Sequence, residues 1–178
     1  MPDSSHNTVL IVGVGAGLSA SLARLFSKFG LKIALASRSI DDIAGLASET
    51  GARVFACDAS QESQVAQLFR DIDATLGSPD VVIYNASFRT RGEFIDFVPA
   101  DVQKAIAISA FGAFLVAQQA ARRMLPNKHG AIFFTGASAG VKGYPRSAPF
   151  AMAKSPCAAC RKALRANCNR KASTSPIS

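Results

Sequence analysis

The sequence lacks tryptophan altogether, and only 18% of its residues are charged, less than the roughly one quarter of an average soluble protein. It also lacks a long apolar run, because polar residues such as Ser109 and Gln118 interrupt the longest uncharged stretch, residues 105–121, which is too short to span a bilayer. The polar N-terminus MPDSSHN has no apolar segment of the kind that a secretory signal needs. We therefore expect a cytoplasmic protein with no membrane partner, in which residues 105–121 form a buried helix.

Acidic residues are absent from the C-terminal part of the chain, residues 155–178, which carries five of the twenty basic residues. The net charge of +8 therefore comes mostly from this tail, and the rest of the chain has an ordinary balance of charges. Aromatic residues do not accompany the basic ones there, so we expect no nucleic-acid partner. With 49% hydrophobic residues, the chain can bury a substantial core, and the sequence predicts a folded domain over residues 1–154 followed by an aberrant basic tail over 155–178.

Strand-like and helix-like segments alternate along this domain. The strand-like segments are short apolar runs typical of strands buried on both faces: residues 8–12, 31–37, 52–56, 80–85 and 130–136. The helix-like segments are residues 17–29, 40–49, 60–75 and 101–124. The alternation predicts an α/β fold with a three-layer, doubly wound parallel sheet of the Rossmann type. Ligands of such sheets bind where the strands end, so the residues after each strand are the candidate site.

A glycine-rich turn, VGVGAGL, follows the first of these strands. Gly13, Gly15, Gly17 and Leu18 allow the backbone N–H groups at the start of the next helix to approach a pyrophosphate. Two registers fit: a G-x-G-x-x-A pattern that starts at Gly15, and a G-x-x-x-G pattern that starts at Gly13. The alternative to nucleotide binding is a tight strand-to-helix turn with no ligand.

The residues after the second strand, Ser37 and Arg38, bear on the choice of cofactor. NAD-binding sites usually place a carboxylate here for the ribose 2′-hydroxyl, whereas an arginine can pair with a 2′-phosphate. Arg38 therefore favours NADP over NAD, and the alternative is a solvated arginine at a helix entry.

Polar residues also follow the third and fourth strands. In the segment CDAS, Asp58 is positioned to accept a hydrogen bond from an adenine amino group, next to Ala59. Asp58 is equally suited to cap the following helix, with Ser60 as the rival cap. In YNAS, Asn85 either ties strand ends together or lines the cofactor site beside Ala86.

Taken in order, the glycine turn, CDAS, YNAS, the helix segment FGAFLVAQQAARRM, FFTGASAG and a residue-x-x-x-Lys segment resemble the short-chain dehydrogenase/reductase family. The resemblance covers about residues 8–154. It implies a Rossmann sheet, a nicotinamide cofactor, and hydride transfer to or from a small-molecule carbonyl or alcohol.

The resemblance also implies a catalytic set, most of which is substituted here. In the family, a tyrosine four residues before a lysine donates the proton, a serine thirteen residues earlier binds the substrate oxygen, and an asparagine takes part in a proton relay. By spacing, the lysine is Lys154, and the other positions hold Phe150, Ala137 and Ser109. Phenylalanine keeps the shape of tyrosine without its titratable oxygen, so we expect cofactor binding to survive and proton transfer to be weak or absent.

Two neighbouring residues offer a rescue of the missing groups. Ser138 lies one residue from the serine position, and Tyr144 lies in the following loop. A one-residue shift on an extended segment turns a side chain to the opposite face, and Tyr144 lacks the one-turn relation to Lys154. The candidate catalytic residues are thus Lys154, Ser138 and Tyr144, and Lys154 is also a candidate to bind the nicotinamide ribose.

The tail contains Cys157, Cys160 and Cys168, which are too few ligands for a zinc site, so we expect no metal. Read one base out of phase, its codons can encode an amphipathic helix and a strand, which favours a frameshift directly after Lys154 and a C-terminally truncated domain. Loss of the family's last strands would leave a bare sheet edge and an uncovered helix face at residues 111–116, so we expect a homo-oligomer. The alternatives to a weak oxidoreductase are a non-catalytic nucleotide-binding or partner subunit and a non-functional truncated product.

Overall fold

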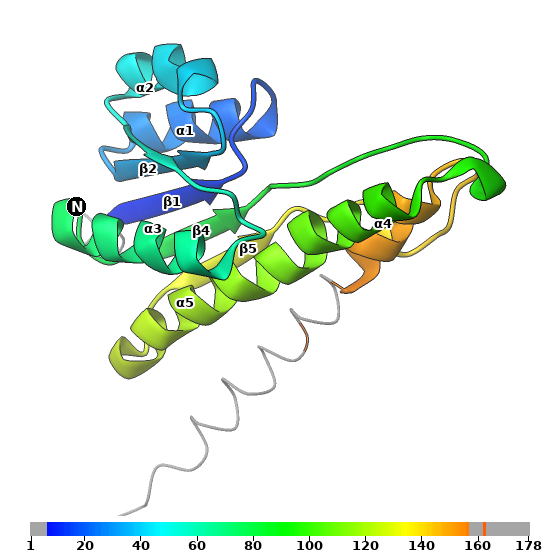
Figure 1. Cartoon of the computed structure of the whole chain (residues 1–178). Coiled ribbons are helices and arrows are strands. Elements are labelled where there is room, and N and C mark those ends of the chain that lie inside the picture. The colour runs from blue at the N-terminus through cyan, green and yellow to red at the C-terminus, as the bar shows by residue number, and fades with distance from the viewer. Residues whose placement is uncertain (1–6, 157–161, 163–178) are drawn as a thin grey trace, which may run out of the picture. The chain divides into compact units, whose positions relative to one another are not determined.

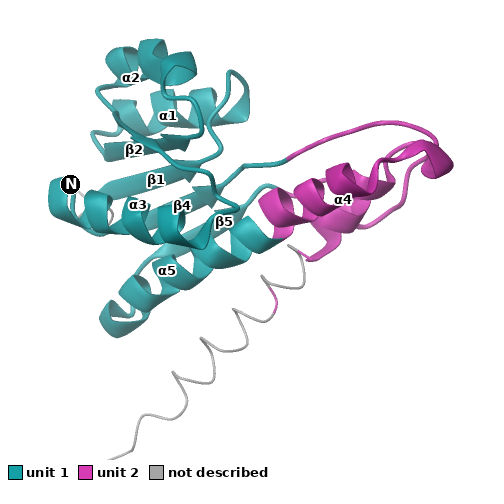
Figure 2. Ribbon diagram, in the orientation of Figure 1, with its two compact units in different colours: residues 1–87, 111–135 teal, residues 88–110, 136–178 magenta. Residues whose placement is uncertain are grey.

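The computed structural model describes residues 7–156 and residue 162, and these residues form two compact units (Figure 2). The described part of unit 1 is residues 7–87 and 111–135, and that of unit 2 is residues 88–110, 136–156 and 162. The predicted frameshift and the cysteines of the tail lie outside the described residues. A single domain over residues 1–154 stays a prediction.

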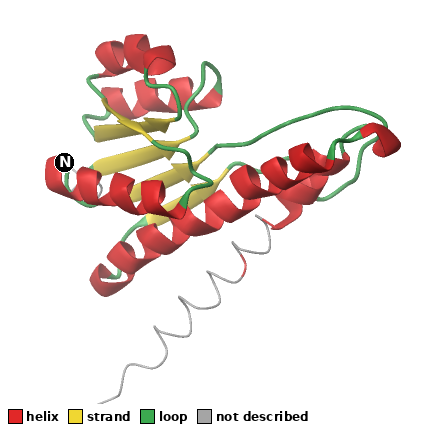
Figure 3. Ribbon diagram, in the orientation of Figure 1, coloured by secondary structure: helices red, strands yellow, loops and turns green. Residues whose placement is uncertain are grey.

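Unit 1 contains a parallel sheet of five strands in the order β3-β2-β1-β4-β5 (Figures 1 and 3). The strands are β1 Thr8–Val12, β2 Lys32–Ser37, β3 Arg53–Ala56, β4 Val81–Tyr84 and β5 Ala131–Phe134. All five lie within the segments predicted from the apolar runs. Every residue of β1 and β4 is buried, which explains why these strands are continuous apolar runs rather than alternating ones.

Helices cover both faces of the sheet, so unit 1 has the predicted three layers. One face carries α1 Leu18–Lys28 and α2 Ala44–Thr50, the latter preceded by the short turn η1 Asp41–Ile43, and the other carries α3 Glu62–Thr75 and α5 Gly112–Asn127. The core on the α1 side is formed by Val9, Ile11, Ala23, Ile33, Leu35, Ile43, Val81 and Ile83. On the other side, α3 buries Val65, Leu68, Phe69 and Ile72.

The helical stretch predicted over residues 101–124 is longer and less regular than expected. It starts at Pro99, where proline suits the first turn, and consists of α4 Pro99–Ile106, the π-helical segment η3 Ala107–Phe111, and α5. By length and composition alone, residues 99–127 would suffice to cross a membrane, a criterion that core helices of soluble proteins also meet. Because seven residues of α5 are buried, including Leu115 and Val116, we interpret it as a core helix.

Glycine at position 112 lets α5 lie close to the sheet. A Cβ atom there would collide with the Tyr84 hydroxyl and lie 2.6 Å from the Ala59 carbonyl oxygen. The close approach brings the start of α5 against the loop that follows β3.

The helix face at residues 111–116 is only partly uncovered, contrary to the expectation from the sequence. Phe111 and Phe114 are about half exposed and their rings stack with centroids 6.4 Å apart, but Leu115 and Val116 pack into the core. Phe133 on the edge strand β5 is 56% exposed. Self-association of the chain stays a prediction, and these exposed aromatic side chains favour it.

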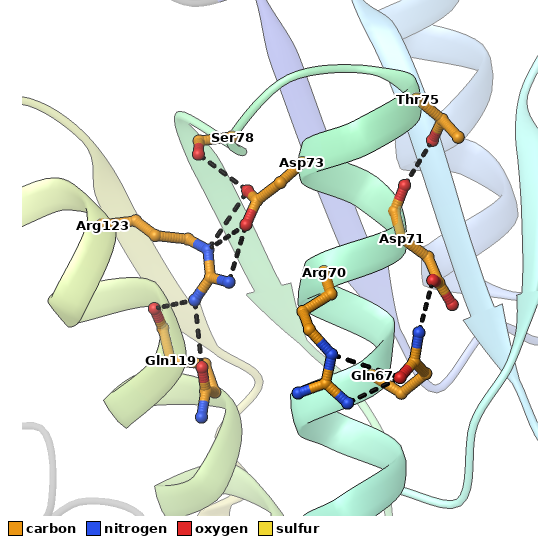
Figure 4. Close-up of polar contacts among 8 residues, drawn as sticks. All are labelled: Gln67, Arg70, Asp71, Asp73, Thr75, Ser78, Gln119 and Arg123. Carbon is orange, nitrogen blue, oxygen red and sulfur yellow. Dashed lines mark hydrogen bonds and ion pairs between the residues drawn. The ribbon is translucent and has the colours of Figure 1, made fainter.

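A polar network joins α3 to α5 (Figure 4). The Arg123 guanidinium donates to both carboxylate oxygens of Asp73, at 2.7–3.1 Å, and to the backbone and side-chain oxygens of Gln119. Ser78 Oγ donates to the same aspartate, and the Arg123 guanidinium carbon lies 4.9 Å from the Phe69 ring centroid. The Arg123 side chain is 19% exposed, so the ion pair is more shielded from water than a surface pair.

We therefore expect Arg123→Met to lower the free energy of unfolding by about 1–3 kcal/mol, because Asp73 would keep its charge but lose the N–H donors of Arg123. Urea unfolding followed by circular dichroism measures the change. The matched control is Arg24→Met, which removes the exposed pair between Arg24 and Glu49, and it should shift the midpoint much less. Equal shifts in the two variants would contradict the structural role given to Arg123.

Candidate functional site

The strand register places the predicted nucleotide-binding residues of unit 1 along one edge of the sheet. Val12 is level with Ala36 and Tyr84, and Ser37 is level with Ala56. The residues that follow these strands therefore lie side by side: Gly13, Arg38, Cys57, Asp58, Asn85 and Ala86.

The turn after β1 depends on Gly13. Its φ of +83° is unfavourable for other residues, and a Cβ atom there would collide with the backbone of Ala86. Its N–H donates to the Ala36 carbonyl at 2.9 Å. Because neither Gly15 nor Gly17 has a positive φ, the geometry favours the register that starts at Gly13.

The outer part of the same turn is open. A Cβ atom at Gly15 or Gly17 would meet no atom within 4 Å, and both glycines are exposed. Helix α1 starts directly after Gly17 with no side-chain cap and no acidic residue in its first turn, and its first residue, Leu18, is 53% exposed. An uncapped helix N-terminus with free access for a ligand suits an anionic group, so these residues fit a dinucleotide pyrophosphate.

Asn85 ties the end of β4 to this turn, one of its two predicted roles. Its side-chain N–H group donates to Ser19 Oγ at 2.8 Å and to the Gly13 carbonyl at 3.2 Å, and Ser19 Oγ donates to the same carbonyl. Ser19 was not among the predicted site residues, so its part in this network was missed. The signal available in the sequence was a serine at the second position of the helix that follows the glycine turn.

Asp58 does not cap α3, and neither does Ser60. The N-cap residue of α3 is Gln61, which makes no side-chain capping bond. Instead, the Asp58 carboxylate accepts the backbone N–H and the hydroxyl of Ser60, at 2.9 and 2.7 Å, and the Asp58 N–H donates to Gln64. Asp58 thus shapes the loop after β3, and a contact with adenine stays a prediction.

Ser37 is half-buried at the end of β2, and Arg38, directly after it, is exposed. Among the residues that the structure describes, Arg38 makes no ion pair. Its guanidinium is therefore free to bind a ligand at the same edge as the glycine turn. Of the other two predicted cofactor-binding residues, Ala59 is buried and Ala86 half-buried, and each can offer only backbone groups to a ligand.

Unit 2 contains the residues that the family resemblance assigns to chemistry. Residues 148–156 are helical, which places Phe150 and Lys154 one turn apart, with the Lys154 ammonium nitrogen 6.0 Å from the Phe150 ring centroid. The turn η4 Ser138–Gly140 lies against this helix, because the Ser155 hydroxyl donates to the Gly140 carbonyl at 3.0 Å. A Cβ atom at Gly140 would lie 3.2 Å from Lys154 backbone atoms, so a glycine allows this close approach.

The serine and asparagine positions of the family have different surroundings in unit 2. Ala137 has an extended backbone directly before η4, with no hydroxyl to offer. Ser138 is exposed and Tyr144 is 48% exposed. Ser109 is fully buried inside the π-helical segment η3, and its hydroxyl accepts the Phe88 N–H at 3.4 Å. π-helical turns are common at functional sites, and no pattern in the sequence predicted this one.

Three comparisons with known proteins agree with this geometry. A family model described as enoyl-(acyl carrier protein) reductase matches residues 13–172. The chain is 33% identical over 148 residues to (+)-borneol dehydrogenase 1 of Salvia officinalis, covering 75% of this chain and 55% of that protein. The chain spans about half the length of several curated relatives that it matches.

Solved structures show the same fold. A short-chain dehydrogenase from Rhodopseudomonas palustris matches with a TM-score of 0.81 and 27% identity, over 89% of this chain and 76% of that one. A tyrosine-to-phenylalanine variant of ElxO with NADPH bound matches with a TM-score of 0.78 and 25% identity, over 85% of this chain and 63% of that one. The chain belongs to the short-chain dehydrogenase/reductase family.

Cys57, the cysteine of the predicted domain, lies beside the site, but its thiol has low reactivity. It is buried, and burial, together with the neighbouring Asp58 charge, raises the pKa of its thiol to about 11. A thiol must ionise to react with alkylating agents, so almost none of it is reactive at neutral pH.

We expect iodoacetamide at about pH 8 to leave Cys57 unmodified in the folded chain and to label it in denaturant, as read by mass spectrometry of its peptide. Since the folded state holds this proton more tightly than the unfolded chain, the thiol's contribution to stability is full below about pH 8.5 and is lost as the pH rises toward about 11. Rapid labelling of the folded chain would show that Cys57 is accessible.

Proposed function

We propose that this chain is an NADP(H)-binding oxidoreductase domain of the short-chain dehydrogenase/reductase type that acts on a carbonyl or alcohol and turns over weakly or not at all. The observation that carries cofactor binding is the open turn at Gly15 and Gly17 before an uncapped helix α1. The preference for NADP is supported by the exposed Arg38 at the same edge of the sheet. A cytoplasmic location is part of the same proposal.

Phe150 supports the weak turnover. NADPH, when bound, supplies a hydride to the carbonyl carbon of a substrate. The carbonyl oxygen must also receive a proton, and Phe150, one turn before Lys154, has no atom that can donate it. The ElxO variant shows that a phenylalanine in place of a tyrosine is compatible with bound NADPH in a protein of similar fold.

The second candidate is a nucleotide-binding or partner subunit without catalysis. Phe150 also favours this non-catalytic candidate, because a phenylalanine in place of the proton donor does not alter the predicted nucleotide-binding residues of unit 1. Measuring turnover of an aldehyde and ketone panel with NADPH separates the two candidates. Any rate that depends on Lys154 supports the oxidoreductase, and NADPH binding with no turnover supports the subunit.

The cofactor preference gives one prediction. NADPH should bind more tightly than NADH, because the Arg38 guanidinium can pair with the 2′-phosphate, and Arg38→Asp should reverse the order. Fluorescence titration of both cofactors measures this. The exposed Arg53 at the start of β3 provides the control, since Arg53→Asp changes the net charge equally and should leave the preference for NADPH in place. Equal affinities of the unmodified chain for the two cofactors would show that Arg38 does not select between them.

Catalysis gives a second prediction. In a chain whose reading frame after Lys154 is restored, Phe150→Tyr together with Ala137→Ser should raise turnover by about 10²–10³-fold, the usual value of one proton donor or oxyanion partner. Adding Lys154→Met to that pair should cancel the gain. In the 178-residue chain the same pair should change little. Robust reductase activity of the unmodified chain would refute the role given to Phe150, and Tyr144 and Ser138 would then be the residues to replace first.

A further inference from the structure

Arg89 of unit 2 has an unusual environment for an exposed arginine. Its guanidinium carbon lies 5.0 Å from the centroid of the Phe150 ring. Three other arginines have acidic partners: Arg24 pairs with Glu49, Arg123 with Asp73, and Arg146, also in unit 2, with Glu93. Within residues 7–156, the structure gives Arg89 no ion pair, so an aromatic ring, and not a carboxylate, holds this cation in place.

The ring beneath Arg89 is the one that occupies the tyrosine position of the family. A guanidinium that lies over an aromatic face keeps the N–H groups on its edge available, and those groups match the two oxygens of a carboxylate or phosphate. The Lys154 ammonium nitrogen lies 6.0 Å from the same centroid. Arg89 is exposed whereas Lys154 is buried, so Arg89 is the cation beside this ring that an anion in solution can reach.

The segment that carries Arg89 is held by its preceding residue. The Phe88 N–H donates to the hydroxyl of the buried Ser109, and the Lys104 ammonium nitrogen lies 4.7 Å from the Phe88 ring centroid. Phe88 is therefore fastened to the π-helical segment η3 by its backbone and to α4 by its side chain. Arg89 extends from an anchored backbone, which lowers the entropy lost when it binds a ligand.

We propose that Arg89 binds an anionic group, a carboxylate or a phosphate, of the substrate, so that the substrate class is an anionic carbonyl compound or its alcohol. This substrate class rests on the proposed oxidoreductase function. The anion contact itself depends only on Arg89 and Phe150. Phe150 is the residue that stands where the family has its proton-donating tyrosine.

Binding by the full-length chain, measured by calorimetry, tests this without any turnover. The carboxylate probe is levulinate, compared with its uncharged methyl ester, and the phosphate probe is dihydroxyacetone phosphate, compared with dihydroxyacetone. The unmodified chain should bind at least one of the two anions about tenfold or more tighter than its neutral counterpart, the usual effect of a charge-assisted contact. Whichever anion shows the preference identifies the group that Arg89 recognises.

Three variants assign the preference to a residue. Arg89→Gln should abolish it, Arg89→Lys should retain only part of it because an ammonium lacks the two-pronged geometry, and the control Arg91→Gln should leave it unchanged. Arg89 and Arg91 are both exposed, so their replacement should leave the thermal melt of the chain unaltered. A preference that survives in Arg89→Gln, or no preference for either anion in the unmodified chain, would overturn the proposal.

NADPH titration of the same proteins separates this inference from the proposed function. Arg89→Gln should bind NADPH as tightly as the unmodified chain does. If it loses NADPH affinity in parallel with its affinity for the anion, Arg89 binds a phosphate of the cofactor and the proposal is wrong. If no protein binds NADPH, the proposed oxidoreductase function fails, whereas an anion preference lost in Arg89→Gln still supports the anion contact.

Discussion

The central strand β1 is the constraint on which unit 1 depends. It is hydrogen-bonded to β2 on one side and β4 on the other, and all of its side chains are buried. A strand in this position needs helices on both faces of the sheet, because no residue of it can face water. The Val12 carbonyl at its end accepts the N–H groups of Asn85 and Ala86, at 2.8 and 3.1 Å. The glycine turn and the end of β4 are thereby held at one edge, the edge at which ligands of open parallel sheets bind.

The substituted positions of unit 2 have contacts of their own. The Ser109 hydroxyl accepts a backbone N–H of the segment after β4, and the Phe150 ring lies beneath Arg89. A chain that had merely lost catalytic groups would leave gaps or unpaired polar atoms where they stood. Here Ser109 and Phe150 both contact the segment that follows β4.

The sequence predicted much of the fold because the deciding signals are local. A run of apolar residues bounded by turn formers indicates a buried strand wherever it pairs, and all five strands lie where those runs stand. The local geometry of the site was harder to predict from the sequence. Asp58 and Ser60 looked like helix caps, yet they bond to each other, because the chain between β3 and α3 turns before the helix begins at Glu62. The π-helical segment at Ser109 was missed because apolar periodicity does not distinguish it from an α-helix.

By itself, the sequence determined the class of fold, the elements of unit 1, the glycine turn and the positions that the family resemblance assigns to catalysis, since all of these follow from spacing along the chain. The tertiary structure alone decided the strand order β3-β2-β1-β4-β5, the bonds from Asn85 to the glycine turn, and the placement of Arg89 over Phe150. These contacts join residues far apart in sequence. Their partners are chosen by strand pairing and by packing in three dimensions, which no local pattern of residues encodes.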